Sequence, residues 1–177
     1  MPTINDRACV VNGVPVDKVL SNGKQVYGRN LLTNTSDFSS NWYGILSVST
    51  TTKYNGHPSM VFTSENSRNT TYIFGVGKLE NSFRYTSSFW AKADNAGDKA
   101  HIELWGSIGA TDVVLTTNWV RYTAVLTSFS DVKNNTAYSR QYLGVPGGNK
   151  GNVYIALPKL EKGSVSTPWT PAPEDVM

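Results

Sequence analysis

Apolar and polar residues alternate along many short stretches of this chain, and the spacing typical of helices is nearly absent. The stretch TSSFWAKADNAGDKAHIELWG, residues 86–106, contains two such runs around a polar loop. Successive side chains of a β-strand point to opposite faces, so this alternation predicts strands with one buried face. Such runs recur at residues 43–51, 59–63, 70–76, 83–92, 99–105, 112–115, 120–127, 140–145 and 152–158. Short strands at this spacing predict an all-β fold, an antiparallel β-sandwich or barrel.

The composition suits such a fold and argues against two classes of partner. Of the 177 residues, 39% are hydrophobic and only 16% are charged, with Ser, Thr, Asn and Gly in place of charge. The net charge of +3 is scattered without a run of Lys or Arg, so nucleic-acid binding is not expected. No window approaches the ~20 apolar residues of a membrane span, so membrane insertion is not expected either.

The N-terminus has no features of a secretion signal, because residues 1–6 lack both a basic start and an apolar run. Cys9 is the single cysteine, so the chain cannot form an intramolecular disulfide. We interpret Cys9 as a small apolar residue in a strand. We therefore expect the chain to be made and folded in a reducing cytoplasm. It would act outside the cell after lysis or as part of a particle.

The first segment reads as a small β-meander. Asn12-Gly13 and Asn22-Gly23 separate short β-branched runs, and Asn-Gly is a strong hairpin signal because both residues accept positive φ. Three strands of about 20 residues are too few to be stable alone, so this segment must dock on the main domain or on a partner. We expect a meander over residues 1–28, a main domain over 29–170 and a tail over 171–177.

Strand parity predicts the direction of Trp90 and Trp105. In the first strand Trp90 alternates with core-type residues and falls on the side of Arg84, Thr86, Ser88 and Lys92. In the next strand Trp105 falls on the side of His101 and Glu103, opposite Ala100, Ile102 and Leu104. A one-residue shift would bury several charges, so both indoles are expected on a polar, solvent-facing side.

Two indoles on one polar face suggest a platform for a sugar ring. Polar groups around a flat aromatic surface are the composition of a sugar-binding groove. The candidate carbohydrate-binding residues are Trp90, Trp105, Arg84, Ser88, His101, Glu103, Tyr72 and Tyr154. The alternative is that Trp105 caps the end of the sandwich and Trp90 lies under a loop. The remaining tryptophans, Trp42, Trp119 and Trp169, are interpreted as structural, with Trp169 holding the tail against the body.

Catalytic patterns are missing from the sequence. There are only two histidines, and no HExxH, CxxC, GxSxG or phosphate-loop pattern occurs. Glycoside hydrolysis needs two carboxyl groups in one groove, and Glu103 is the only acid that parity places on the aromatic face. We therefore expect no catalytic residues, no metal site and no enzyme activity.

Several motifs resemble jelly-roll carbohydrate-binding modules of the kind fused to glycosidases. These are Asn30-Leu31-Leu32, YTSSFWAK at 85–92, LTTNWVRYTAVL at 115–126 and VYIALPKLEKGS at 153–164. More narrowly, the chain resembles tail and baseplate proteins of siphophages of lactic-acid bacteria. That resemblance is carried by VNGVPVDKVLSNGKQVYG at 11–28, VYGRNLL at 26–32 and KLEKGSVSTPWTPAPED at 159–175.

The resemblance implies a virion protein of the tail tip or baseplate, whose partners are host cell-surface polysaccharide and other tail proteins. Related modules often hold a structural calcium with acids in the last strand. The equivalent stretch here is Ala156-Leu157-Pro158, with Glu161 the only nearby acid, which argues against calcium. We expect no cofactor. Two further hypotheses stay open: a structural adaptor that contacts other tail proteins through the aromatic face, and an enzyme acting on wall polysaccharide.

Overall fold

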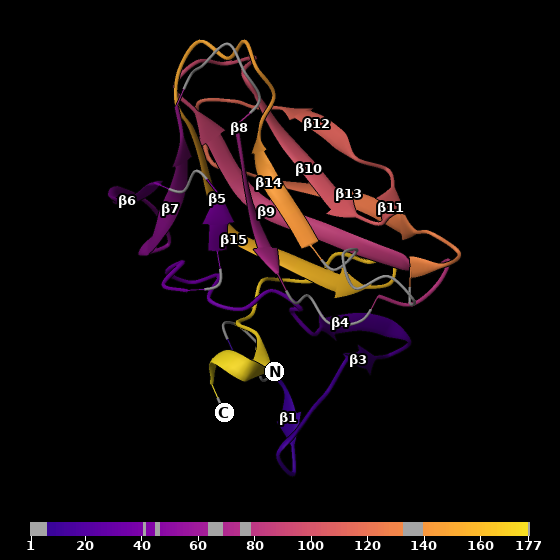
Figure 1. Ribbon diagram of the computed structural model, residues 1–177. Coiled ribbons are helices and arrows are strands. Elements are labelled where there is room, and N and C mark those ends of the chain that lie inside the picture. The colour runs from indigo at the N-terminus through magenta and orange to yellow at the C-terminus, as the bar shows by residue number, and fades with distance from the viewer. Residues whose placement is uncertain are drawn as a thin grey trace.

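The protein is an antiparallel β-sandwich, as the alternation in the sequence predicts (Figure 1). The computed structural model describes residues 7–40, 42–44, 47–63, 69–74, 79–132 and 140–176, with only the backbone for residues 69–74. Sheet I has the strand order β12 (Thr111–Val114), β10 (Lys99–Trp105), β14 (Arg140–Val145), β8 (Asn69–Phe74) and β5 (Trp42–Gly44). Sheet II has the order β11 (Ser107–Ile108), β13 (Val120–Ser128), β9 (Arg84–Ala93), β15 (Val153–Lys162), β7 (His57–Phe62) and β6 (Ser47–Tyr54).

The core lies between the two sheets. The inward positions of the central strands carry fully buried apolar side chains, among them Phe89, Ile102, Leu104, Leu126, Leu143 and Ile155. Their alternation with polar outward residues follows the period of two of an extended strand. Trp42 is buried in this core, as its interpretation as structural predicts.

Two strand predictions need correction. The run 43–51, expected as one strand, contains the end of β5 and the start of β6, and these strands belong to opposite sheets. The last strand runs to Lys162 rather than residue 158, because a β-bulge between Ala156 and Lys159, with Leu157 at φ 49°, lets pairing with β9 resume. The bulge reverses the parity, so Ile155 before it and Leu160 after it both face the core.

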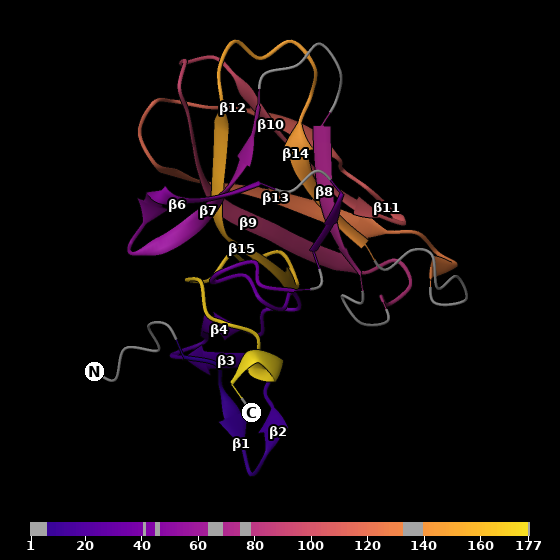
Figure 2. The same cartoon turned by 60° about the vertical axis from the view of Figure 1, so that its left-hand side comes forward.

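The N-terminal segment forms two separate hairpins instead of the expected three-stranded meander (Figure 2). β1 (Val10–Val11) pairs with β2 (Val14–Pro15), and β3 (Lys18–Ser21) pairs with β4 (Lys24–Gly28). Both predicted Asn-Gly turns are confirmed, with positive φ at each Asn and Gly. Pro15 ends β2 and has no N–H to donate to a third strand, which explains why the two hairpins do not join.

The C-terminal segment, residues 163–173, returns across the outer face of sheet II. The Thr86 hydroxyl donates to the Gly163 carbonyl, and Arg121 of β13 donates to the Thr167 carbonyl. Trp169 is buried and its indole N–H donates to the Thr35 hydroxyl at 3.1 Å, so its predicted role in holding the tail is confirmed. The segment ends in the short 3₁₀ turn η3 (Pro173–Asp175), and the described residues include no helix long and apolar enough to cross a bilayer.

Asn30 links the entry segment of the sandwich, the last strand β15 and the C-terminal segment on the outer side of sheet II. The two N–H groups of its amide nitrogen are shared among three acceptors, Thr35 Oγ1 and the carbonyls of Pro158 and Thr170, and its Oδ1 accepts from the N–H groups of Leu32 and Leu160. The side chain is fully buried. One buried amide therefore has five hydrogen-bond partners, which connect the entry of the sandwich, its last strand and the C-terminal segment.

Replacing Asn30 is expected to destabilise the whole fold. Asn30→Ala leaves several buried polar groups without partners, so the free energy of unfolding should fall by about 3 kcal/mol or more. Urea denaturation followed by tryptophan fluorescence measures the change. Asn118→Ala, at an exposed turn position, is the matched control and should change stability by less than about 0.5 kcal/mol. Equal effects of the two substitutions would contradict the role given to Asn30.

Candidate functional site

Trp90 and Trp105 do not form one platform. Trp90 lies in β9 of sheet II and Trp105 in β10 of sheet I, so their outward directions are opposite (Figure 1). Parity places each indole correctly on the outer side of its own strand, and both are half-buried. The prediction that the two indoles share one face is therefore wrong. Alternation shows only which side of its own strand a residue occupies, and the chain passes from one sheet to the other in the loop between β9 and β10.

The outer face of sheet I carries a row of aromatic positions, here named the tyrosine row. Tyr43 of β5, Tyr72 of β8, Tyr142 of β14 and Glu103 of β10 are directly opposite one another in register. Tyr43 is 48% exposed, and Tyr142 is half-buried. For Tyr72 the structure fixes the register position, and its side chain lies outside the described residues. The row crosses the sheet at right angles to the strands.

Arg140 and Trp105 stand beside this row. They are register partners in β14 and β10, and the Arg140 guanidinium lies 4.5 Å from the centre of the Trp105 ring. The Trp105 and Tyr142 rings meet edge to face, with centroids 6.0 Å apart. The cation and the two rings fix one another's orientation, which limits the entropy lost when a ligand stacks on them.

Acidic groups flank the aromatic surface on the side of β12. His101 Nδ1 lies 2.7 Å from Asp112 Oδ1, and His101 Nε2 lies 3.3 Å from Glu103 Oε2. A neutral imidazole has one N–H, so both hydrogen bonds form together only when the ring carries two protons. The carboxylates are partly exposed and offer acceptors to hydroxyl groups.

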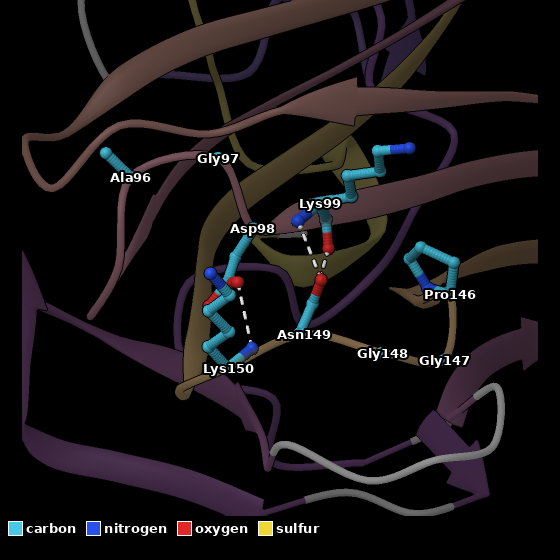
Figure 3. A pocket seen from close by; sticks show the side chains of 9 residues that line it. All are labelled: Ala96, Gly97, Asp98, Lys99, Pro146, Gly147, Gly148, Asn149 and Lys150. Carbon is cyan, nitrogen blue, oxygen red and sulfur yellow. Dashed lines mark hydrogen bonds between the residues drawn. The ribbon is translucent and has the colours of Figure 1, made fainter.

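A pocket of about 270 Å³ lies at the end of the same sheet (Figure 3). Its loop is held rigidly, because Asn149 accepts from the Lys99 N–H and donates to the Lys99 carbonyl. The nearly buried Asp98 accepts from the N–H groups of Lys150 and Gly151, both at 2.9 Å. Lys99 shares the outward parity of His101 in β10, so this rim continues the outer face of sheet I.

The other predicted site residues lie on sheet II. Ser88 is 1% exposed and its hydroxyl accepts from Arg121, so the prediction that Ser88 lines an open groove is wrong. The C-terminal segment covers it, and the alternation within β9 contains no sign of that cover. Arg84 is exposed at the start of β9, and Tyr154 lies with Lys92 on the outer side, the Lys92 ammonium 5.5 Å from its ring. Neither shares a face with Trp105 or Glu103.

Sequence reasoning missed four residues of the sheet I face: Tyr43, Asp112, Arg140 and Tyr142. The alternation in RQYLGV at 140–145 already separates Arg140 and Tyr142 from the buried Gln141 and Leu143. Period-two parity could therefore have found these two. Tyr43 and Asp112 lie in short edge strands, where only the pairing places them beside the others.

The structure also tests the calcium that the resemblance implies. Glu161 accepts from the N–H and the hydroxyl of Thr167, and the Lys159 ammonium lies 3.8 Å from the same carboxylate. Both side chains are fully buried. An added cation would be repelled by this buried ammonium, so the residues around Glu161 do not fit calcium. Among the described residues, no group of three or more His, Cys, Asp or Glu is arranged to hold a metal.

Comparison with known proteins shows the fold. No protein-family model matches the sequence, and no curated protein matches it either. The CBM22-1 xylan-binding domain of Xyn10C from Paenibacillus barcinonensis has a TM-score of 0.57 and 12% identity, covering 80% of this chain and 99% of that domain. The CBM22-1-GH10 modules of xylanase 10B from Clostridium thermocellum have a TM-score of 0.51 and 15% identity, covering 76% and 28%. The jelly-roll prediction is confirmed.

The buried Lys159 should give stability a distinct pH dependence. Burial lowers the pKa of its ammonium from 10.5 to about 8. Repulsion from Arg121 also lowers this pKa, and attraction to Glu161 opposes both effects. The unfolded chain then binds more protons between these two pH values, so the unfolding free energy rises with pH across that interval. Relative to Lys159→Met, the wild type should gain about 3 kcal/mol between pH 7 and pH 10.5.

Urea titrations of both proteins across this range measure the difference, in which the contributions of the tyrosines cancel. A difference between the two proteins that stays constant with pH would contradict the assignment of a buried, partly neutral Lys159.

Proposed function

We propose that this protein is a non-catalytic carbohydrate-binding module of a phage tail or baseplate, which binds host cell-wall polysaccharide through the outer face of sheet I. The observation that carries the proposal is the tyrosine row with Trp105 beside it. Tyr43, Tyr142 and Trp105 present aromatic surface on one open face, with carboxylates and a guanidinium next to them.

The energetics suit a weak, reversible sugar site. Stacking one pyranose face on an aromatic ring covers roughly 80 Å² of apolar surface, which at ~25 cal/mol per Å² contributes about 2 kcal/mol. Glu103 and Asp112 accept hydrogen bonds from hydroxyl groups, and Arg140 donates them. Such a combination of a few aromatic groups and a few convergent polar groups is typical of ligand sites.

The fold supports a binding role in general terms. The Paenibacillus domain with the same fold is described as xylan-binding, and the Clostridium modules were solved with xylohexaose. The proposal for this chain rests on its own aromatic face, because one fold serves many functions.

The phage assignment rests on the terminal segments. The N-terminal hairpins and the stretch KLEKGSVSTPWTPAPED resemble tail and baseplate proteins. A single weak site is sufficient on such a particle, since many copies raise the overall avidity by orders of magnitude without new contacts.

A second candidate is an adaptor domain that contacts other tail proteins. The exposed side chains of Val11, Val14 and Leu20 on the N-terminal hairpins favour it, with exposed fractions of 56%, 63% and 56%. These hairpins lie outside the sandwich (Figure 2), so protein contact there is compatible with sugar binding on sheet I.

The sheet I face can be tested by removing two aromatic groups. A fluorescent fusion should bind isolated host wall polysaccharide, and Tyr43→Ala combined with Trp105→Ala should weaken that binding at least about tenfold, because stacking surface is lost. Tyr154→Ala, which removes an aromatic ring from sheet II, is the matched control and should bind as the wild type does. Titration by fluorescence anisotropy measures all three proteins.

Unchanged binding by the double variant would remove this face from the site. Binding to purified tail proteins with none to polysaccharide would favour the adaptor. Release of reducing ends from the polysaccharide by the pure protein would instead favour the enzyme hypothesis.

A further inference from the structure

A hollow with aromatic walls lies on the opposite side of the molecule, on sheet II. It has a volume of about 340 Å³, and its walls include Tyr54, Trp90, Arg121, Pro168 and Trp169. These residues come from β6, β9, β13 and the C-terminal segment, so the hollow exists only in the folded chain. None of them belongs to the sheet I face.

The aromatic wall of this hollow is well fixed. Tyr54 stacks on Trp90 with ring centroids 4.3 Å apart and planes 20° apart, and Trp119 lies 5.5 Å from Tyr54. Trp169 is held by its hydrogen bond to Thr35. Tyr54, Trp90 and Trp119 remain half-buried, so part of each ring still faces solvent.

Arg121 supplies positive charge to the hollow. Its Nη2 donates to the Ser88 hydroxyl at 3.0 Å and to the Thr167 carbonyl. Within the described part of the chain no carboxylate forms an ion pair with it, and desolvation lowers the pKa of its guanidinium despite the field of Glu161.

The charges behind the hollow do not balance. Lys159 lies on β15 beneath the C-terminal segment and is paired with Glu161. Arg121 repels Lys159, and Glu161 attracts both. Two cations therefore share one carboxylate in a weakly solvated region, and an anion in the hollow would offset the excess positive charge.

We propose that this hollow is a second binding site, which takes a phosphate- or carboxylate-bearing sugar with its anionic group at Arg121 and its ring on the Tyr54–Trp90 wall. The guanidinium fork matches either anion, since both offer paired oxygen acceptors. The stacked aromatic wall supplies the flat apolar surface that a sugar ring covers. The site stands independently of the sheet I face.

The test uses the whole chain and four soluble probes: glucose 6-phosphate, glucuronic acid, glucose and inorganic phosphate. The indole N–H signals of Trp90, Trp119 and Trp169 are followed by ¹H–¹⁵N NMR while each probe is added. We expect saturable shifts with the two anionic sugars at millimolar concentration and affinity at least about tenfold lower for glucose, because the charge-assisted hydrogen bonds are lost.

Arg121→Gln removes the charge, keeps an amide donor, and should weaken glucose 6-phosphate binding at least about tenfold. If Arg121→Gln does not keep the native NMR spectrum, Tyr54→Ala serves as the test instead and should also weaken glucose 6-phosphate binding, since it removes the stacking wall. Tyr54 lies at the end of the edge strand β6, where the fold tolerates its loss. The Tyr43→Ala, Trp105→Ala double variant should bind glucose 6-phosphate as the wild type does.

Absence of saturable shifts with both anionic sugars would overturn the proposal and leave the aromatic group with a packing role. If glucose binds as tightly as glucose 6-phosphate, the anionic group has no role in binding. If inorganic phosphate binds as tightly as glucose 6-phosphate, the sugar ring has no role. Loss of glucose 6-phosphate binding in the sheet I double variant would overturn the separate location. Failure at this hollow leaves wall-polysaccharide binding by sheet I unaffected, so the two proposals fail separately.

Discussion

The structure depends on the buried polar network under the C-terminal segment. Asn30 bonds to the entry segment, the last strand and the tail, while Thr167 bonds to Gly28, Lys159 and Glu161. Buried polar groups are costly unless every partner is present, so this network specifies one position for the tail. It also makes the two outer faces of the sandwich unequal, since the tail covers much of sheet II and leaves the tyrosine row of sheet I uncovered.

That inequality separates two kinds of aromatic surface. On sheet I, Tyr43 and Trp105 lie on an open face whose polar neighbours are partly hydrated. On sheet II, the tail residues Pro168 and Trp169 complete a hollow around Trp90 and place it over an excess of buried positive charge. The first surface suits stacking of neutral sugar units, and the second suits an anionic group, because charge interactions strengthen where water is excluded.

Local sequence rules predicted much of the fold. The Asn-Gly turns, the strand alternation and the inward positions of Ala100, Ile102 and Leu104 all follow from preferences within a few residues. These local rules failed where a part of the chain distant in sequence, or a bulge, changes which side chains are exposed. Ser88 has the alternation of an exposed residue, yet the tail buries it, and the bulge at Leu157 reverses the parity of β15.

The outward direction of Trp90 and Trp105 follows from the amino-acid sequence alone, since the period of two holds within one strand whatever its neighbours are. The pairing of the strands, by contrast, places the two indoles on opposite sheets and puts Tyr43, Tyr142 and Arg140 on the same face as Trp105. Which strands pair is set by long-range burial of the core and by the loop between β9 and β10. Alternation along one strand carries no information about either.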